Sequence, residues 1–194
     1  MNYKVLAALV AACVAQAVPM VVVRAQESAA GAEASLTGEP TQAQPVLAKE
    51  SLSIVSATGT HAFSVEVART PRQQQVGEMF RTAVPEDGGM LFPWKTPRQS
   101  DMWMQNTVVP LDIVFIGSDR RVSSIVENAV PYSLAYISSH GPVLATLELA
   151  GGLTAKLGIT VGDKVVSATL AGDETGNAKG NATGATTGAA HPAP

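Results

Sequence analysis

Residues 101–112 hold the densest group of side chains that could recognise a ligand. Trp103 offers a flat indole for stacking, while Asn106, Thr107 and Asp112 add an amide, a hydroxyl and a carboxylate. These groups form directional hydrogen bonds, so the lining suits a saccharide or another small polar molecule. A structural role is equally consistent with the residue types, because Asn and Asp satisfy backbone donors at bends and Trp fills cores.

Glu148 interrupts an otherwise apolar stretch, VLATLELAGG. A buried carboxylate is costly unless it is paired, so we expect either a structural ion pair with Arg81 or exposure to solvent. An alternative places Glu148 beside Asp112, where two carboxyl groups in one cleft would allow glycosidase-like hydrolysis. Arg81 and Glu148 therefore join the candidate ligand-binding residues, and no residue is predicted to be catalytic.

Metal and thiol chemistry have weak support in the sequence. Met102 and Met104 would share one face of a strand, and thioethers bind copper(I). However, no histidine is close in sequence, and methionine is an ordinary core residue. The only cysteine, Cys13, lies in the N-terminal apolar stretch, so a chain processed after it has no thiol. We expect no metal and no cofactor.

The elements that position these residues follow from periodicity and turn residues. Apolar residues alternate over 61–68 with Phe63, Val65 and Val67 on one face, which predicts a strand. A threonine followed by proline predicts a helix over 70–80. Other strands are predicted at 100–107, 111–116, 121–127, 143–149 and 164–170, and a second helix at 151–157. We expect a mainly β (α+β) fold, an antiparallel β-sandwich or barrel-like sheet with two short helices packed on it.

The N-terminus has the features of a secretory signal. Lys4 precedes the apolar VLAALVAACV, and small residues follow it. Cleavage sites of the small-x-small type end at Ala17 and Ala25, and the second removes all the apolar residues, which favours 1–25 as the signal peptide. A lipoprotein anchored at Cys13 is an alternative. Polar residues interrupt the ~20 apolar residues that a membrane span needs, so we expect a periplasmic or secreted protein without a span.

Two low-complexity arms flank the predicted domain. Residues 26–51 contain no aromatic residue, and 172–194 have glycine at every fourth position from 172 to 188. Neither arm can bury enough apolar area to offset its ordering entropy. The sequence thus predicts a disordered linker, one domain over 52–171 and a disordered tail. Without residues 1–25 the net charge is about −5, which argues against nucleic acid as a partner.

The middle of the chain resembles the family called domain of unknown function 192. The resemblance rests on four motifs in the family's order: GMLF ending at Phe92, WMQNTVVPLDIVF at 103–115, LELAG at 147–151 and GITVGDKV at 158–165. It implies a small, mainly β, often exported domain with no established activity. Gln75 stands where the family has arginine, before Val-Gly-Glu-Met in place of Gly-Leu-Met, and Gln105 replaces a lysine.

These patterns together predict an exported, non-catalytic ligand-binding or accessory domain of the cell envelope. One alternative is a carboxylate-dependent hydrolase that uses Asp112 and Glu148. The other is a structural or protein-interaction module, for which an exposed apolar patch would be the sign.

Overall fold

The computed structural model describes residues 38–171. The chain divides into the units Met1–Glu39 and Pro40–Pro194, and the fold described below belongs to the second unit. The predicted signal peptide, residues 26–37 of the predicted linker and the tail 172–194 lie outside the described residues. Within residues 38–171 no helix is long and apolar enough to cross a membrane.

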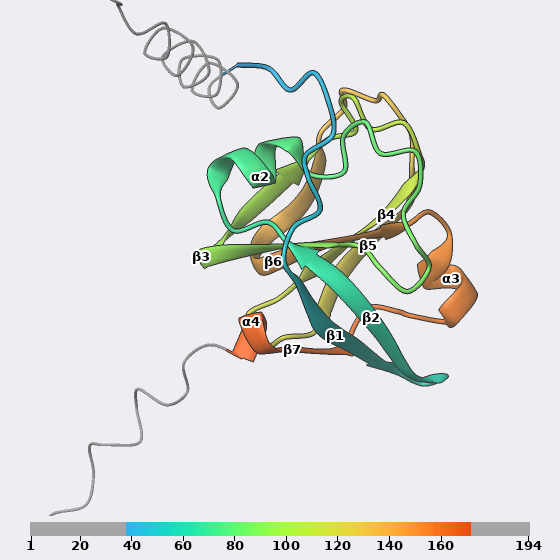
Figure 1. Ribbon diagram of the computed structural model, residues 1–194. Helices are drawn as coiled ribbons and strands as arrows, with labels where there is room; N and C mark the ends of the chain where they lie inside the picture. The colour runs from blue at the N-terminus through green and yellow to red at the C-terminus, as the bar shows by residue number, and fades with distance from the viewer. Residues whose placement is uncertain (1–37, 172–194) are drawn as a thin grey trace, which may run out of the picture. The chain divides into compact units, whose positions relative to one another are not determined.

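Seven strands form one mixed sheet in the order β5-β4-β6-β3-β2-β1-β7 (Figure 1). Three short helices accompany it in the described part of the chain. The strands are β1 (Lys49–Ser56), β2 (Gly59–Val67), β3 (Met90–Met102), β4 (Leu111–Ile116), β5 (Val122–Ala129), β6 (Ile137–Ala150) and β7 (Lys164–Ser167), and the helices are α2 (Pro71–Val76), α3 (Leu153–Leu157) and α4 (Ala168–Ala171).

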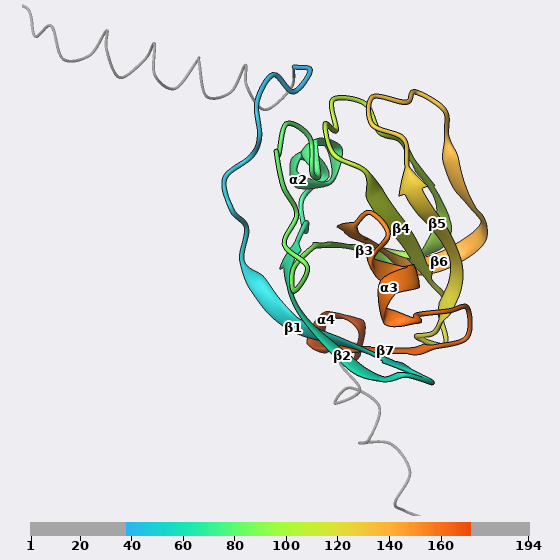
Figure 2. The ribbon, with the colours of Figure 1, turned by 90° about the vertical axis from the view of Figure 1, so that its right-hand side faces the viewer.

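The mainly β class is confirmed, but the sheet differs from the predicted one. β2 and β3 pair in parallel, through Glu66–Met90 and Val67–Leu91, because α2 and the loop after it return the chain to the same end of the sheet. Figure 2 shows β1, β2 and β7 turned away from the direction of β4, β5 and β6. The sheet is not closed: within 38–171 its edge strands meet in one isolated bridge, Arg121–Lys164.

The N-terminal boundary predicted at residue 52 falls inside β1. This strand begins at Lys49 and pairs along its whole length with β2, from Lys49–Glu66 to Ser56–Gly59. The residues before it are also bound, since the Leu47 N–H donates to Glu66 Oε2 at 2.7 Å. Backbone pairing orders this segment, although its composition lacks the apolar periodicity that would have marked it as a strand.

The sequence predicted one end of each of its two helices: the start of α2 after Thr70 and the end of α3 at Leu157. Thr70 is the N-cap of α2, and with Gln73 it forms the capping box that satisfies free backbone N–H groups. The helix ends at Val76 rather than near residue 80. The last predicted strand also stops early, at Ser167, and α4 follows it as a third helix.

The core covers both faces of β4, all six of whose residues are buried. On one face Val114 and Ile116 pack with Leu52, Val65 and Leu147 in the largest cluster. On the other face Leu111, Ile113 and Phe115 pack with Met104 and Val143. The predicted inward face of β2 is confirmed, since Phe63, Val65 and Val67 are buried.

Candidate functional site

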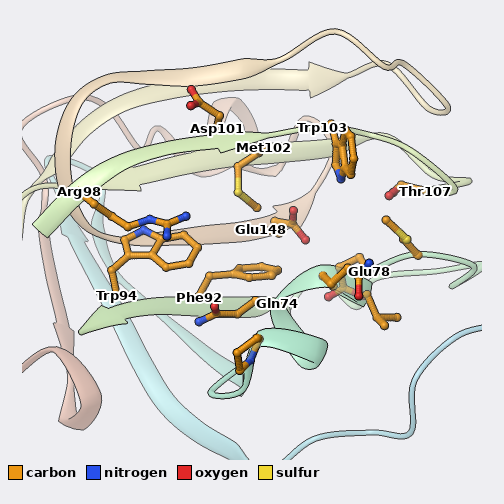
Figure 3. A pocket seen from close by; sticks show the side chains of 15 residues that line it. Gln74, Glu78, Phe92, Trp94, Arg98, Asp101, Met102, Trp103, Thr107 and Glu148 are labelled. Atoms are coloured by element: carbon orange, nitrogen blue, oxygen red, sulfur yellow. The ribbon is translucent and has the colours of Figure 1, made fainter. Parts of the chain in front are cut away.

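A pocket of about 230 Å³ lies between α2 and the strands β3 and β6 (Figure 3). Exposed side chains surround its mouth, among them Gln75, Arg98, Asp101 and Trp103. Its floor consists of buried residues, which are Val76, Gly77, Glu78, Met79, Phe92, Thr107 and Glu148. The pocket therefore leads from solvent to two carboxyl groups inside the domain.

The end of α2 places Glu78 at the floor. Gly77 stops the helix with a φ of 49° and a ψ of −132°, a conformation that side-chain-bearing residues avoid. The next side chain, Glu78, is 3% exposed. Its Oε2 atom is buried and accepts no hydrogen bond from the described residues. Such an unpaired buried oxygen is uncommon in folded proteins.

Glu148 reaches the same floor from β6. It pairs with Met90 on β3 and with Ile113 on β4, so its side chain emerges on the face that carries these residues. It is 4% exposed, and its Oε2 atom also lacks a hydrogen-bond partner in residues 38–171. The backbone of Gly77 approaches closely, since a Cβ built there would lie 3.7 Å from this oxygen.

Arg81 lies behind the floor and is mainly engaged by another acid. Its Nη1 and Nη2 atoms donate to the two carboxylate oxygens of Glu66, at 2.6 and 2.8 Å. Its Nε atom is 3.2 Å from Glu78 Oε2, an ion-pair contact without hydrogen-bond geometry. The Arg81–Glu148 pair expected from the sequence is therefore replaced by a bidentate Arg81–Glu66 pair.

The two floor carboxyl groups titrate abnormally. Burial raises the pKa of Glu78 to about 7, against the opposing charge of Arg81 and with a further upward contribution from Glu66. Burial likewise raises the pKa of Glu148 well above its usual value, and the neighbouring Glu78 adds to the rise. Burial opposes ionisation of Glu66 too, but hydrogen bonds from Arg81 and the Leu47 N–H lower its pKa overall.

Aromatic side chains form the walls, and both tryptophans of the chain are among them. The Arg98 guanidinium lies over the Trp94 ring, 4.4 Å from its centroid. The Trp94 Nε1–H group is buried and donates to no described residue. On the other wall Trp103 stacks on Tyr136, with the ring centroids 6.1 Å apart and the planes 9° from parallel. These rings give a ligand flat surfaces to pack against.

The structure brings three of the six predicted site residues together at this pocket: Trp103, Thr107 and Glu148. Arg81 lies behind them through its contact with Glu78. Asn106 does not line the pocket; its backbone has a φ of 56°, and its Nδ2 atom lies 3.9 Å from Met79 Sδ.

Asp112 has a structural role and is separated from Glu148. It is fully buried, and its carboxylate accepts hydrogen bonds from the N–H groups of Asn128, Gly152 and Thr154, each at 2.8 Å, and from Thr154 Oγ1 at 2.6 Å. These bonds tie the turn before α3 to β4 and the end of β5. The predicted cleft shared by Asp112 and Glu148 is wrong, because the two side chains emerge on opposite faces of the sheet.

Sequence reasoning missed Glu78, Trp94, Arg98 and Met102 as pocket residues. Glu78 carried a usable signal, because it is an acidic residue between apolar neighbours in VGEMF, like Glu148 in its strand. Trp94 and Arg98 carried no such signal, since only the fold of β3 brings them to the same cavity as α2.

The fold is a mainly β domain built on one sheet. Its pocket has an acidic floor between α2 and β6. Residues 53–167 match the model of the DUF192 family, described as Uncharacterized ACR. The chain belongs to this family.

Two crystal structures are similar to the chain over most of their own length. One, from Sinorhizobium meliloti 1021 and described as a proposed transcription regulator, is 42% identical, with a TM-score of 0.62 over 65% of this chain and 98% of that one. The other, a protein of unknown function from Novosphingobium aromaticivorans DSM 12444, is 44% identical, with a TM-score of 0.62 over 69% of this chain and 96% of that one. The comparison with curated proteins found no match.

Proposed function

We propose that this chain is an exported binding protein of the cell envelope whose domain holds a small polar ligand in the Glu78–Glu148 pocket. The observation that carries the proposal is a pair of carboxyl groups that are almost fully buried, have unpaired oxygens and line a cavity open to solvent. Export is supported by the N-terminal apolar segment and its small-x-small sites.

A purely structural role explains these carboxyl groups poorly. Elsewhere in the domain buried acids are satisfied: Asp112 accepts four hydrogen bonds and Glu66 accepts from Arg81 and Leu47. Unpaired buried polar atoms cost about 1–3 kcal/mol each. Such a cost at one place, facing a cavity, is typical of a site whose partner is a ligand.

The pocket lining indicates the size and character of the ligand. A cavity of about 230 Å³ accommodates a single small molecule rather than a chain of residues. The rings of Trp94 and Trp103 provide apolar contact, and the carboxyl groups provide hydrogen bonds. A saccharide unit fits this combination and remains the first class to screen.

Intrinsic fluorescence tests the proposal directly, because the chain's two tryptophans both line the pocket. We screen envelope saccharides, amines and metabolites. A ligand of the pocket is expected to change the tryptophan emission until the site is saturated. Glu148→Gln and Trp103→Phe should each weaken binding, whereas Glu127→Gln, at an exposed position of β5, should not. A ligand that binds both pocket variants as tightly as it binds the wild-type protein would contradict the site.

The loop over residues 130–136 favours a second candidate function, docking of a protein partner. Its apolar side chains Val130, Tyr132, Leu134 and Tyr136 are 63–73% exposed, as expected of an interaction surface. Leu134→Ser separates the two functions, because Leu134 does not line the pocket. Ligand binding should survive this change, and a loss of binding would assign the loop to the ligand site.

The description of the Sinorhizobium structure as a transcription regulator is not extended to this chain. This chain has a net charge of −3 and an isoelectric point of about 5.6. DNA binding depends on basic groups that neutralise phosphates, and the pocket floor is acidic.

A further inference from the structure

The two buried carboxyl oxygens of the pocket floor receive no hydrogen bond from the described residues. Glu78 Oε2 and Glu148 Oε2 are unpaired acceptors. Two nearby donors are committed elsewhere, since Gln74 Nε2 donates to the carbonyls of Ala68 and Pro93 and the Gly77 N–H donates to Gln73. The free Trp94 Nε1–H lies in the wall beside Arg98, away from Glu78 in Figure 3. A ligand that satisfies the floor must therefore bring its own donors.

When both floor carboxyl groups are ionised, the charges around the floor leave an acidic excess. Glu66, Glu78 and Glu148 then surround Arg81, which donates to Glu66 through Nη1 and Nη2 and makes a 3.2 Å ion-pair contact with Glu78 through Nε. The only further cation that acts on these three groups in the described residues is Lys49, through Glu66. Arg98 lies at the other end of the pocket in Figure 3, over Trp94 and away from Glu78. With a neutral ligand the raised pKa values keep the floor carboxyl groups protonated, whereas a cation would offset the charge of the ionised groups.

The walls are also suited to a cation. Phe92 and Trp103 present rings, and Met79 and Met102 present polarisable thioethers. Aromatic faces attract ammonium and guanidinium groups by about 0.5–2 kcal/mol. The Arg98 guanidinium over Trp94 is an instance of this contact within the pocket itself.

We infer that the ligand carries a protonated amino group, which lies at the floor and donates hydrogen bonds to Glu78 Oε2 and Glu148 Oε2. An ammonium supplies several hydrogen-bond donors and one positive charge, which together satisfy the ionised floor. The inference rests on the proposed function and narrows the ligand to primary amines, including amino sugars and amino acids.

Binding of such a ligand must depend on pH, because an ammonium group binds ionised carboxyl groups more tightly than protonated ones. The groups that set this ionisation are Glu78 and Glu148 themselves, with Arg81 and Glu66 behind them and Arg98 and Asp101 at the mouth. With the pKa of Glu78 raised to about 7 by burial, affinity for an amine should rise between about pH 6 and 8. A neutral saccharide would not show this rise.

Methylammonium is the simplest probe, and methanol is its neutral counterpart of similar size. The full mature chain, labelled with ¹³C at the glutamate carboxyl carbons, is titrated with acid by NMR in matched salt. At roughly ten times its Kd, methylammonium should lower the apparent pKa of Glu78 by about one unit. Glu78→Gln identifies the signal, and sodium chloride and methanol should leave it in place.

Isosteric variants make the result decisive. Glu148→Gln keeps the shape of the floor but removes one charge, so it should reduce the shift of the Glu78 signal severalfold, while Glu127→Gln should not. Melting curves of the three variants show that each is folded. If methylammonium leaves the apparent pKa of Glu78 unchanged, the inference is overturned. If a neutral saccharide still changes the tryptophan emission in that case, the proposed function stands without it; if neither probe binds, both fail.

Discussion

Asp112 and Glu148 lie on neighbouring strands, yet their carboxyl groups emerge on opposite faces of the sheet. In the β4–β6 register Asp112 is opposite Leu149, and Glu148 is opposite Ile113. Since side chains alternate along a strand, a one-residue offset separates the two acids by the thickness of the sheet. One acid became a structural anchor with four hydrogen bonds, and the other became the unpaired floor of a pocket.

The anchoring role predicts a large stability loss for Asp112→Ala. The change leaves three buried N–H groups and the Thr154 hydroxyl without their acceptor, so unfolding in urea should show a loss of about 3–5 kcal/mol. Thr154→Val removes one of these bonds and should cost about 1 kcal/mol. A near-neutral Asp112→Ala would contradict the assigned role.

The raised pKa of Glu78 predicts how stability depends on pH. Burial raises this pKa from 4.5 to about 7, so the folded state holds the proton more tightly than the unfolded state. The contribution of Glu78 to stability should therefore fall as pH rises from about 4.5 to 7, by up to about 3 kcal/mol, and level off above that range. Relative to wild type, Glu78→Gln should gain stability over this window; parallel pH profiles for the two proteins would disprove the shift.

Gly77 is expected to tolerate no side chain. Its φ of 49° disfavours other residues, and a Cβ there would lie 3.2 Å from Phe92 Cζ. Gly77→Ala should lower the free energy of unfolding by about 1–3 kcal/mol and crowd the pocket floor. Gly141→Ala is the matched control, because its Cβ would meet nothing within 4 Å. Its stability should stay within about 0.5 kcal/mol of wild type.

The arms differ in what their removal should do. Deleting residues 26–37 and 172–194 should leave the melting temperature of the mature chain nearly unchanged, as their composition predicts. Extending the first deletion to residue 50 removes the start of β1 and the Leu47–Glu66 hydrogen bond. That larger deletion should lower the melting temperature by more than about 5 °C. Calorimetry of the two truncations decides; equal melting points would show that the segment 38–50 adds nothing.

The proposed export makes a prediction at the N-terminus. Protein recovered from the periplasm or medium should begin at Gln26, after cleavage at Ala25, or at Val18 if the earlier site is used. N-terminal sequencing distinguishes these outcomes. Cys13→Ala should leave the export unchanged, and a lipid-modified N-terminal cysteine would instead establish the lipoprotein alternative.

Local sequence was sufficient for the elements whose signals lie within a few residues. The capping box at Thr70, the alternation through Phe63 and Val67, the bounds of β4 and the cap at Gly158 were predictable, because they depend on backbone preferences and periodicity. The family motifs likewise marked the domain, which the family match over residues 53–167 confirms.

Tertiary structure alone decided the parallel β2–β3 pairing and the composition of the pocket. Glu78 and Glu148 are far apart in the sequence, and only the register of β6 with β3 and β4 turns Glu148 toward Glu78. The same register turned Asp112 the other way. A residue's type states which interactions it can make, but its neighbours across the sheet decide whether a carboxyl group is satisfied or left facing a cavity.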